Sequence, residues 1–74
     1  MADAITRERA ERFGRGHPCL QCGEYSFKKL RVVGASDAQR AELQALWIVR
    51  RACGVCGVES ELGLDAEGDV VFHA

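Results

Sequence analysis

The sequence has no long apolar segment. No run approaches the ~18 residues that a membrane-spanning helix needs. The first 16 residues, MADAITRERAERFGRG, lack the apolar core of a secretory signal and carry Asp3 and Glu8 instead. We therefore expect a cytoplasmic protein, a compartment in which thiols stay reduced and paired cysteines bind metal more often than each other.

An excess of positive charge is also absent. The formal net charge is -1, whereas autonomous nucleic-acid-binding domains are usually strongly basic. Any contact with nucleic acid must therefore come from local clusters of Lys and Arg. The Ala-, Arg-, Gly- and Val-rich composition is typical of a GC-rich bacterial or phage genome.

Catalytic signatures are missing as well. The chain has no Ser/His/Asp order, no phosphate-binding glycine loop and no carboxylate pair beside apolar residues. Asp65, Glu67 and Asp69 flank a turn at alternate positions, which is typical of a solvated hairpin tip. We expect no enzyme.

What the chain does have is four cysteines in 74 residues. A domain of this size buries only roughly 60% of the surface that its unfolded chain exposes. Small domains therefore usually add disulfides, a metal or a partner. The apolar fraction of 47% is that of a globular protein, so the cysteines are the expected source of additional stability.

The cysteines form two Cys-x-x-Cys-Gly turns, CLQCG at residues 19–23 and CGVCG at residues 53–57. Such a turn presents two thiolates to one ion, and tetrahedral zinc takes four ligands. Gly23 and Gly57 let the chain turn while backbone amides point at sulfur. We predict one zinc ion in a closed shell, which argues against zinc hydrolysis. The predicted ligands are Cys19, Cys22, Cys53 and Cys56.

Other uses of the cysteines are weighed against zinc. Iron accepts the same tetrahedral sulfur ligands. Thiol–disulfide exchange requires a low-pKa cysteine at a helix N-terminus after a strand, and neither pair has that setting. His17 lies close to Cys19, but with two complete cysteine pairs we interpret it as a loop residue or a hydrogen-bond donor to a ligand. We treat His73 as uninvolved.

Residues 1–16 are predicted to form an N-terminal helical or flexible arm, and residues 17–74 the domain proper. The helix is expected from Asp3 to Arg12, with opposite charges four residues apart, and to end at the glycines that follow. Because Ile5 and Phe13 are its main apolar residues, we expect a frayed, solvent-exposed arm; the alternative is an arm that docks on a partner. The expected ion pairs are Asp3 with Arg7, Arg7 with Glu11, and Glu8 with Arg12.

A strand is predicted from Glu24 to Val33, where β-branched and aromatic residues lie between two glycines. On a period of two, Phe27 shares one face with Tyr25, Lys29 and Arg31, and Leu30 shares the other with Ser26, Lys28 and Val32.

A helix and three further strands follow. Ser36 and Gln39 fit a capping box, so a helix is predicted from Asp37 to about Leu46. The segment LWIVRRA returns to strand residues before the second cysteine turn. VESELGL and DVVFHA then flank a turn at Gly68 and predict a β-hairpin.

Two cysteine turns that lead into β-hairpin strands resemble the zinc-ribbon class, over roughly Pro18 to Val71. The resemblance implies a small metal-stabilised α+β domain: a zinc-ribbon-like antiparallel sheet with an inserted short helix and an N-terminal helical arm. Rubredoxins are similar too, which implies an iron electron carrier as an alternative. Their second turn usually has Pro after the first cysteine, and their acidic, aromatic-rich middle segment is here replaced by a helix and by Lys28, Lys29 and Arg31.

Basic residues gather near both cysteine turns and alternate with Tyr25, Phe27 and Trp47. This mixture is typical of surfaces that stack bases and contact phosphates. Zinc ribbons as a class frequently belong to transcription, translation and nucleic-acid-processing assemblies. We predict a small zinc-binding accessory or regulatory protein that binds nucleic acid or a transcription-type complex. The predicted nucleic-acid-binding residues are Lys28, Lys29, Arg31, Arg50 and Arg51.

The alternative is a protein–protein interaction module without nucleic-acid contact. In that case Arg51 pairs with Glu59 across the strands, and Arg50 or Val49 faces Glu61. The three aromatic side chains then form the small core, and residues 38–46 offer an amphipathic helix to a partner. No membrane and no small-molecule substrate are expected in either case.

Overall fold

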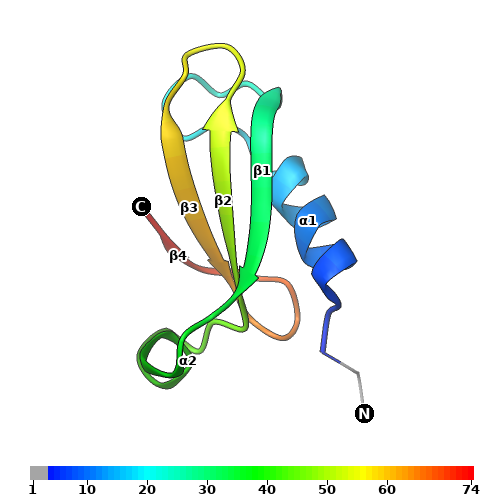
Figure 1. Ribbon diagram of the computed structural model, residues 1–74, viewed down its shortest axis with the longest axis vertical. Helices are drawn as coiled ribbons and strands as arrows, with labels where there is room; N and C mark the ends of the chain where they lie inside the picture. Colours follow the sequence, from blue (N-terminus) through cyan, green and yellow to red (C-terminus); the bar gives the residue numbers. More distant parts are fainter. Residues whose placement is uncertain (1–3) are drawn as a thin grey trace.

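A four-stranded antiparallel sheet with strand order β1-β2-β3-β4 is the centre of the computed structural model, which describes residues 4–74 (Figure 1). Each strand pairs with its sequence neighbours, so the sheet is a simple meander. The predicted small α+β architecture with an inserted short helix is confirmed. The elements are α1 Arg7–Gly16, β1 Phe27–Gly34, α2 Asp37–Leu43, β2 Trp47–Cys53, β3 Glu59–Leu64 and β4 Val70–His73.

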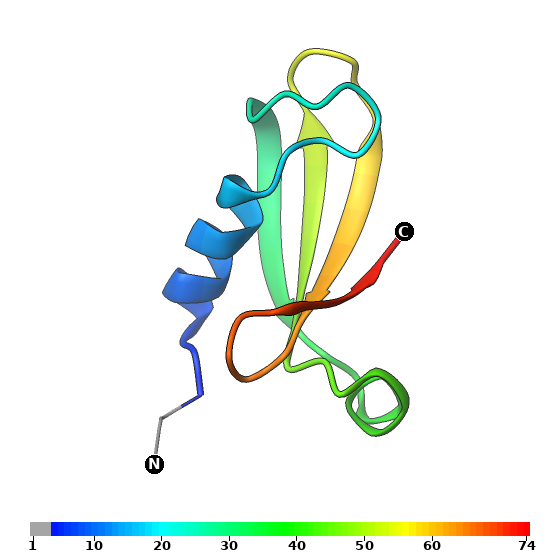
Figure 2. The same cartoon turned by 180° about the vertical axis from the view of Figure 1, so that it is seen from behind.

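Helix α1 lies against one face of the sheet, beside β1 and β2 (Figures 1 and 2). Ile5 and Ala10 belong to the same buried cluster as Val49 of β2, and Ala10 is 0% exposed. The expectation of a solvent-exposed arm with little apolar surface is therefore wrong for this helix. The buried residues of α1 are the small Ala10 and Gly14, and the half-buried Phe13 packs against the same cluster. The boundary after residue 16 stays a prediction, because it concerns independent folding.

The bounds and charge pairs of α1 differ from those expected. The helix begins at Arg7 because the side chain of Thr6 accepts a hydrogen bond from the Arg9 amide at 3.2 Å. Arg7 donates to the Val32 carbonyl on β1 instead of pairing with Glu11, whose carboxylate lies 3.3 Å from Arg15. Asp3 lies outside the described residues.

Strand β1 contains a bulge between Phe27 and Lys29. The extra residue shifts the two-residue alternation, so that Phe27 points to the α1 side of the sheet. There its ring centroid lies 4.3 Å from the guanidinium carbon of Arg51. The prediction that Phe27 shares a face with Lys29 and Arg31 is therefore wrong. The strand also begins at Phe27 rather than Glu24.

Helix α2 begins with the predicted capping box. The Ser36 hydroxyl accepts from the Gln39 amide at 3.2 Å, and the Gln39 side chain accepts from the Ser36 amide at 2.8 Å. The helix ends at Leu43, earlier than predicted, because Gln44 adopts a left-handed conformation with φ 58°. Helix α2 has no buried residue and lies at the opposite end of the sheet from the cysteine turns (Figure 1).

The predicted β3–β4 hairpin is confirmed. Its turn is closed by a bond from the Gly68 amide to the Asp65 carbonyl, and the Asp65 carboxylate accepts from the Glu67 and Asp69 amides. Gly68 has φ 92° and lies against the Phe13 ring of α1.

We predict that Gly14→Ala and Gly16→Ala have different effects on stability, although both lie in α1. A Cβ at Gly14 would lie 2.6 Å from Cγ1 of the buried Val49, whereas a Cβ at Gly16 meets no atom within 4 Å. Gly14→Ala should lower the free energy of unfolding by about 1–3 kcal/mol through overpacking. Gly16→Ala should leave it unchanged or raise it by up to about 1 kcal/mol. Urea unfolding measures both, and equal effects would contradict this packing.

Candidate metal centre

The two cysteine turns lie side by side at one end of the sheet (Figures 1 and 2). The first turn, residues 19–23, precedes β1, and the second, residues 53–57, joins β2 to β3. Both have the same backbone geometry. The Gly23 amide donates to the Cys19 carbonyl at 2.8 Å and the Gly57 amide to the Cys53 carbonyl at 3.2 Å. These glycines have φ 78° and 77°, a left-handed conformation that favours glycine.

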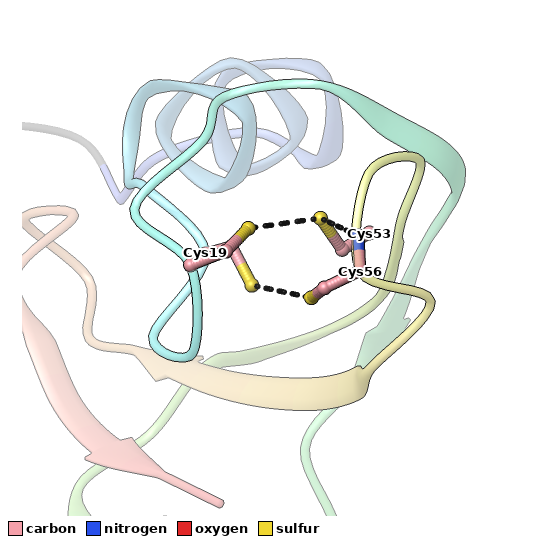
Figure 3. A group of neighbouring side chains, drawn as sticks. Cys19, Cys53 and Cys56 are labelled. Carbon is pink, nitrogen blue, oxygen red and sulfur yellow. Dashed lines mark hydrogen bonds between the residues drawn. The ribbon is translucent and has the colours of Figure 1, made fainter.

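The four sulfur atoms gather between the turns, where they all lie within 4.8 Å of one another (Figure 3). The Sγ atoms of Cys19 and Cys56 are 3.6 Å apart, and those of Cys22 and Cys53 are 3.5 Å apart. Four ligands about 2.3 Å from a tetrahedral zinc would be about 3.8 Å from each other. The four predicted ligands therefore stand at metal-binding distance from one another. All four are free thiols.

Backbone amides favour the thiolate at the first cysteine of each turn. The amides of Cys56 and Val55 donate to the Cys53 sulfur at 3.5 and 3.3 Å and lower its pKa to about 6. The amides of Cys22 and Gln21 lower the pKa of Cys19 in the same way.

The second cysteine of the first turn behaves differently. The Glu24 amide favours the Cys22 thiolate, but desolvation of the sulfur and the hydrogen bonds with the other thiols outweigh it and raise the pKa to about 12. Without a cation the four sulfurs thus do not all ionise at neutral pH. A bound metal ion displaces the remaining protons, so the donor set fits a divalent metal.

The histidines stay apart from the sulfur cluster. His17 follows the last residue of α1, and its Nδ1 lies 2.8 Å from the Phe13 carbonyl oxygen. His73 is exposed on β4. Neither belongs to the group of side chains that stand at metal-binding distance within residues 4–74.

Arg51 is not on the predicted basic surface. Its side chain is 2% exposed and donates to the carbonyls of Gly14, His17 and Pro18 at 2.9, 2.6 and 3.2 Å. The expected pair of Arg51 with Glu59 is also wrong, since Arg51 lies opposite Ser60. Alternation along β2 places Arg51 on the same face as Cys53, two residues later, and so beneath α1.

The other basic residues line a pocket of about 1040 Å³, to which Arg15 of α1 and the buried Arg51 also contribute. Alternation along β2 places Arg50 on the face of the sheet that α1 leaves uncovered. Lys28, Lys29 and Arg31 contribute from β1 and Arg50 from β2. Acidic residues line the far side of the same pocket. The Arg50 Nε lies 3.2 Å from Glu61 Oε1, which confirms the alternative pairing predicted for Arg50.

The three aromatic side chains do not form one stacking platform. The Phe27 ring lies on Arg51, and the indole Nε1 of Trp47 donates to the Ile5 carbonyl at 3.0 Å. Tyr25 is 61% exposed. Of the three, Tyr25 alone is open to a ligand.

Four exposed apolar side chains at the cysteine end were not predicted from the sequence. Most of the exposed large apolar side chains within residues 4–74 belong to the cysteine turns or follow them directly. The sequence could have indicated their exposure, because they lie between or just after the cysteines that are predicted to bind metal, where no core is available to bury them. These residues are Leu20, Tyr25, Val55 and Val58.

Comparison with protein-family models, with curated proteins and with solved structures finds no match for this chain. The zinc-ribbon and rubredoxin resemblances therefore rest on the cysteine turns and the sheet. Within residues 4–74, no helix is long and apolar enough to cross a membrane.

We predict that Gly57→Ala destabilises the second turn through backbone conformation alone. A Cβ at Gly57 meets no atom within 4 Å, but φ is 77°. The substitution should cost about 1–2 kcal/mol of unfolding free energy. Gly34→Ala, which also meets no atom within 4 Å and lacks a positive φ, is the matched control. Equal losses in urea unfolding would contradict the left-handed turn.

Proposed function

We propose that the chain is a small zinc-binding protein in which one zinc ion stabilises the end of the sheet. The observation that carries this proposal is the convergence of four free sulfurs within 4.8 Å. Four thiolates close a tetrahedral shell and leave no position for water or substrate. The role of the ion is therefore structural, and the protein is not an enzyme. The ligands are Cys19, Cys22, Cys53 and Cys56.

The segment between α1 and β1 explains why a metal is needed. Few backbone hydrogen bonds join it to the sheet. One of them, 2.7 Å long, runs from the Gly54 amide to the Ser26 carbonyl. Cys22 and Cys56 are exposed and bury little apolar surface. Metal binding therefore supplies the cohesion of this end, and we expect it to be coupled to folding.

Metal analysis and a Cys53→Ser variant test this role. We expect one zinc ion per chain, and a cobalt-substituted protein with the absorption bands of tetrahedral sulfur ligation. Cys53→Ser should abolish tight binding and leave the chain largely unfolded, as a chelator should do to the unmodified protein. A variant that stays folded without metal would contradict the structural role. A coloured protein with one redox-active iron would favour the rubredoxin-like carrier.

We further propose that the uncovered face binds nucleic acid, alone or within a transcription-type complex in the cytoplasm. Lys28, Lys29 and Arg31 are exposed along β1, and Arg50 stands beside them on β2. Contacts of these charges with phosphates would carry little sequence preference. Glu59 and Glu61 limit this contact to the β1 side of the pocket.

A salt titration against single- and double-stranded DNA and RNA tests nucleic-acid binding. We expect micromolar affinity that falls with salt. In the double variant Lys29→Gln/Arg31→Gln the slope of log affinity against log salt should flatten by about 1.4–1.8, because each lost phosphate contact contributes about 0.7–0.9. The control is Arg9→Gln/Arg12→Gln, which removes the same charge from the exposed side of α1.

A second candidate is a protein interaction module without nucleic-acid contact. The exposed apolar side chains at the cysteine turns favour it, because apolar side chains at one end of a small protein offer surface to a partner. The unburied helix α2 offers another contact. Absence of salt-dependent binding in the titration would favour this candidate.

A further inference from the structure

Arg51 is a buried positive charge without a carboxylate partner. Within residues 4–74, the ion pairs join Glu11 to Arg15 and Arg50 to Glu61, and neither includes Arg51. A buried charge is costly unless an opposite charge compensates it. A compensating group must therefore come from elsewhere in the protein.

The carbonyl groups around Arg51 satisfy its donors without neutralising it. Gly14 and His17, at the C-terminal end of α1, carry only the partial negative charge of a helix end. The third acceptor, Pro18, directly precedes Cys19. The Nε of Arg51 has no hydrogen-bond partner. The guanidinium thus ties the end of α1 to the start of the first cysteine turn.

The sheet register brings Arg51 close to Cys53 of the metal centre. Cys53 is on the same face of β2, two residues along, and Phe27, whose ring stacks on the guanidinium, is the register partner of Cys53. Burial lowers the pKa of Arg51, while negative thiolates at Cys19 and Cys53 act in the opposite direction. The four-sulfur cluster is therefore the negative group placed to compensate this arginine.

We propose that Arg51 is the counter-charge of the metal centre and couples its occupancy to the docking of helix α1. Four thiolates carry more negative charge than a divalent ion neutralises, so the loaded centre compensates the guanidinium. When the metal leaves, the first cysteine turn is no longer held to the second, and the Pro18 carbonyl, which directly precedes Cys19, loses its fixed place beside the guanidinium. Arg51 then keeps fewer acceptors in its buried position, and its hold on the end of α1 weakens. This inference rests on the proposed zinc binding.

Zinc affinity, measured by competition with a chromophoric chelator, tests the role of the charge. Arg51→Gln should bind zinc about 10–100-fold more weakly, the usual effect of losing a group that supports metal ligands. Arg51→Lys, which keeps the charge, should stay within about tenfold of the unmodified protein. The control is Arg50→Gln, the neighbouring exposed arginine, which should change the affinity less than about twofold.

Amide hydrogen exchange tests the coupling to α1. In zinc-saturated Arg51→Gln, the amides of α1 should lose protection while those of β2 and β3 keep it. In zinc-saturated Arg50→Gln, the amides of α1 and those of the two strands should all keep their protection. Arg51→Lys should show partial loss, because one ammonium group cannot reach three carbonyls.

The reduction potential of the iron-substituted protein separates charge from packing. A positive charge beside the centre stabilises the reduced, more negative form. Arg51→Gln should therefore have a lower potential than Arg51→Lys, and Arg51→Lys should resemble the unmodified protein. A role in packing alone would not order the two variants in this way.

Each result has one meaning. If the unmodified protein binds no metal, the proposed zinc site fails. If it binds zinc and Arg51→Gln matches it in affinity and α1 protection, the coupling by Arg51 is overturned. If Arg51→Gln does not fold even with zinc, the zinc affinity of Arg51→Lys is the test. An affinity more than about 100-fold below that of the unmodified protein would overturn the charge-based role.

Discussion

The approach of two cysteine turns from distant parts of the chain is the constraint on which the structure depends. Cys22 and Cys53 are 31 residues apart, yet their sulfurs lie 3.5 Å from each other. The antiparallel pairing of β1 with β2 brings them together, because the first turn precedes β1 and the second follows β2. The bulge next to Phe27 lies within this pairing, close to the cysteine end.

Local structure could be predicted from the sequence where a short residue motif or a single hydrogen-bond pattern determines it. The cysteine turns, the capping box of α2 and the β3–β4 hairpin are of this kind. The sequence misled where tertiary contacts decide. Helix α1 packs through Ala10, Gly14 and Phe13, and the number of large apolar residues does not reveal that the sheet lies close enough to bury this face. A bulge likewise leaves no composition signal, so Phe27 was placed on the wrong face.

The basic residues show the same limit at the candidate site. Arg50 and Arg51 are adjacent in sequence, and composition treats them alike. The alternation of β2 separates them, so that Arg50 faces solvent beside Glu61 while Arg51 is buried under α1. Only the sheet register and the position of α1 distinguish the two. The predicted basic surface thus becomes smaller and shifts toward β1.

Helix α2 lies in the interval between β1 and β2, at the end of the sheet that is remote from the sulfurs. No residue of α2 itself is buried, so the helix can change length as long as Ala35 and Ala45 on either side of it keep their places in the core. The number of residues between the two cysteine pairs is therefore free to vary without moving a ligand. Relatives of this chain are better sought by the two five-residue turns with an interval of variable length than by a fixed spacing.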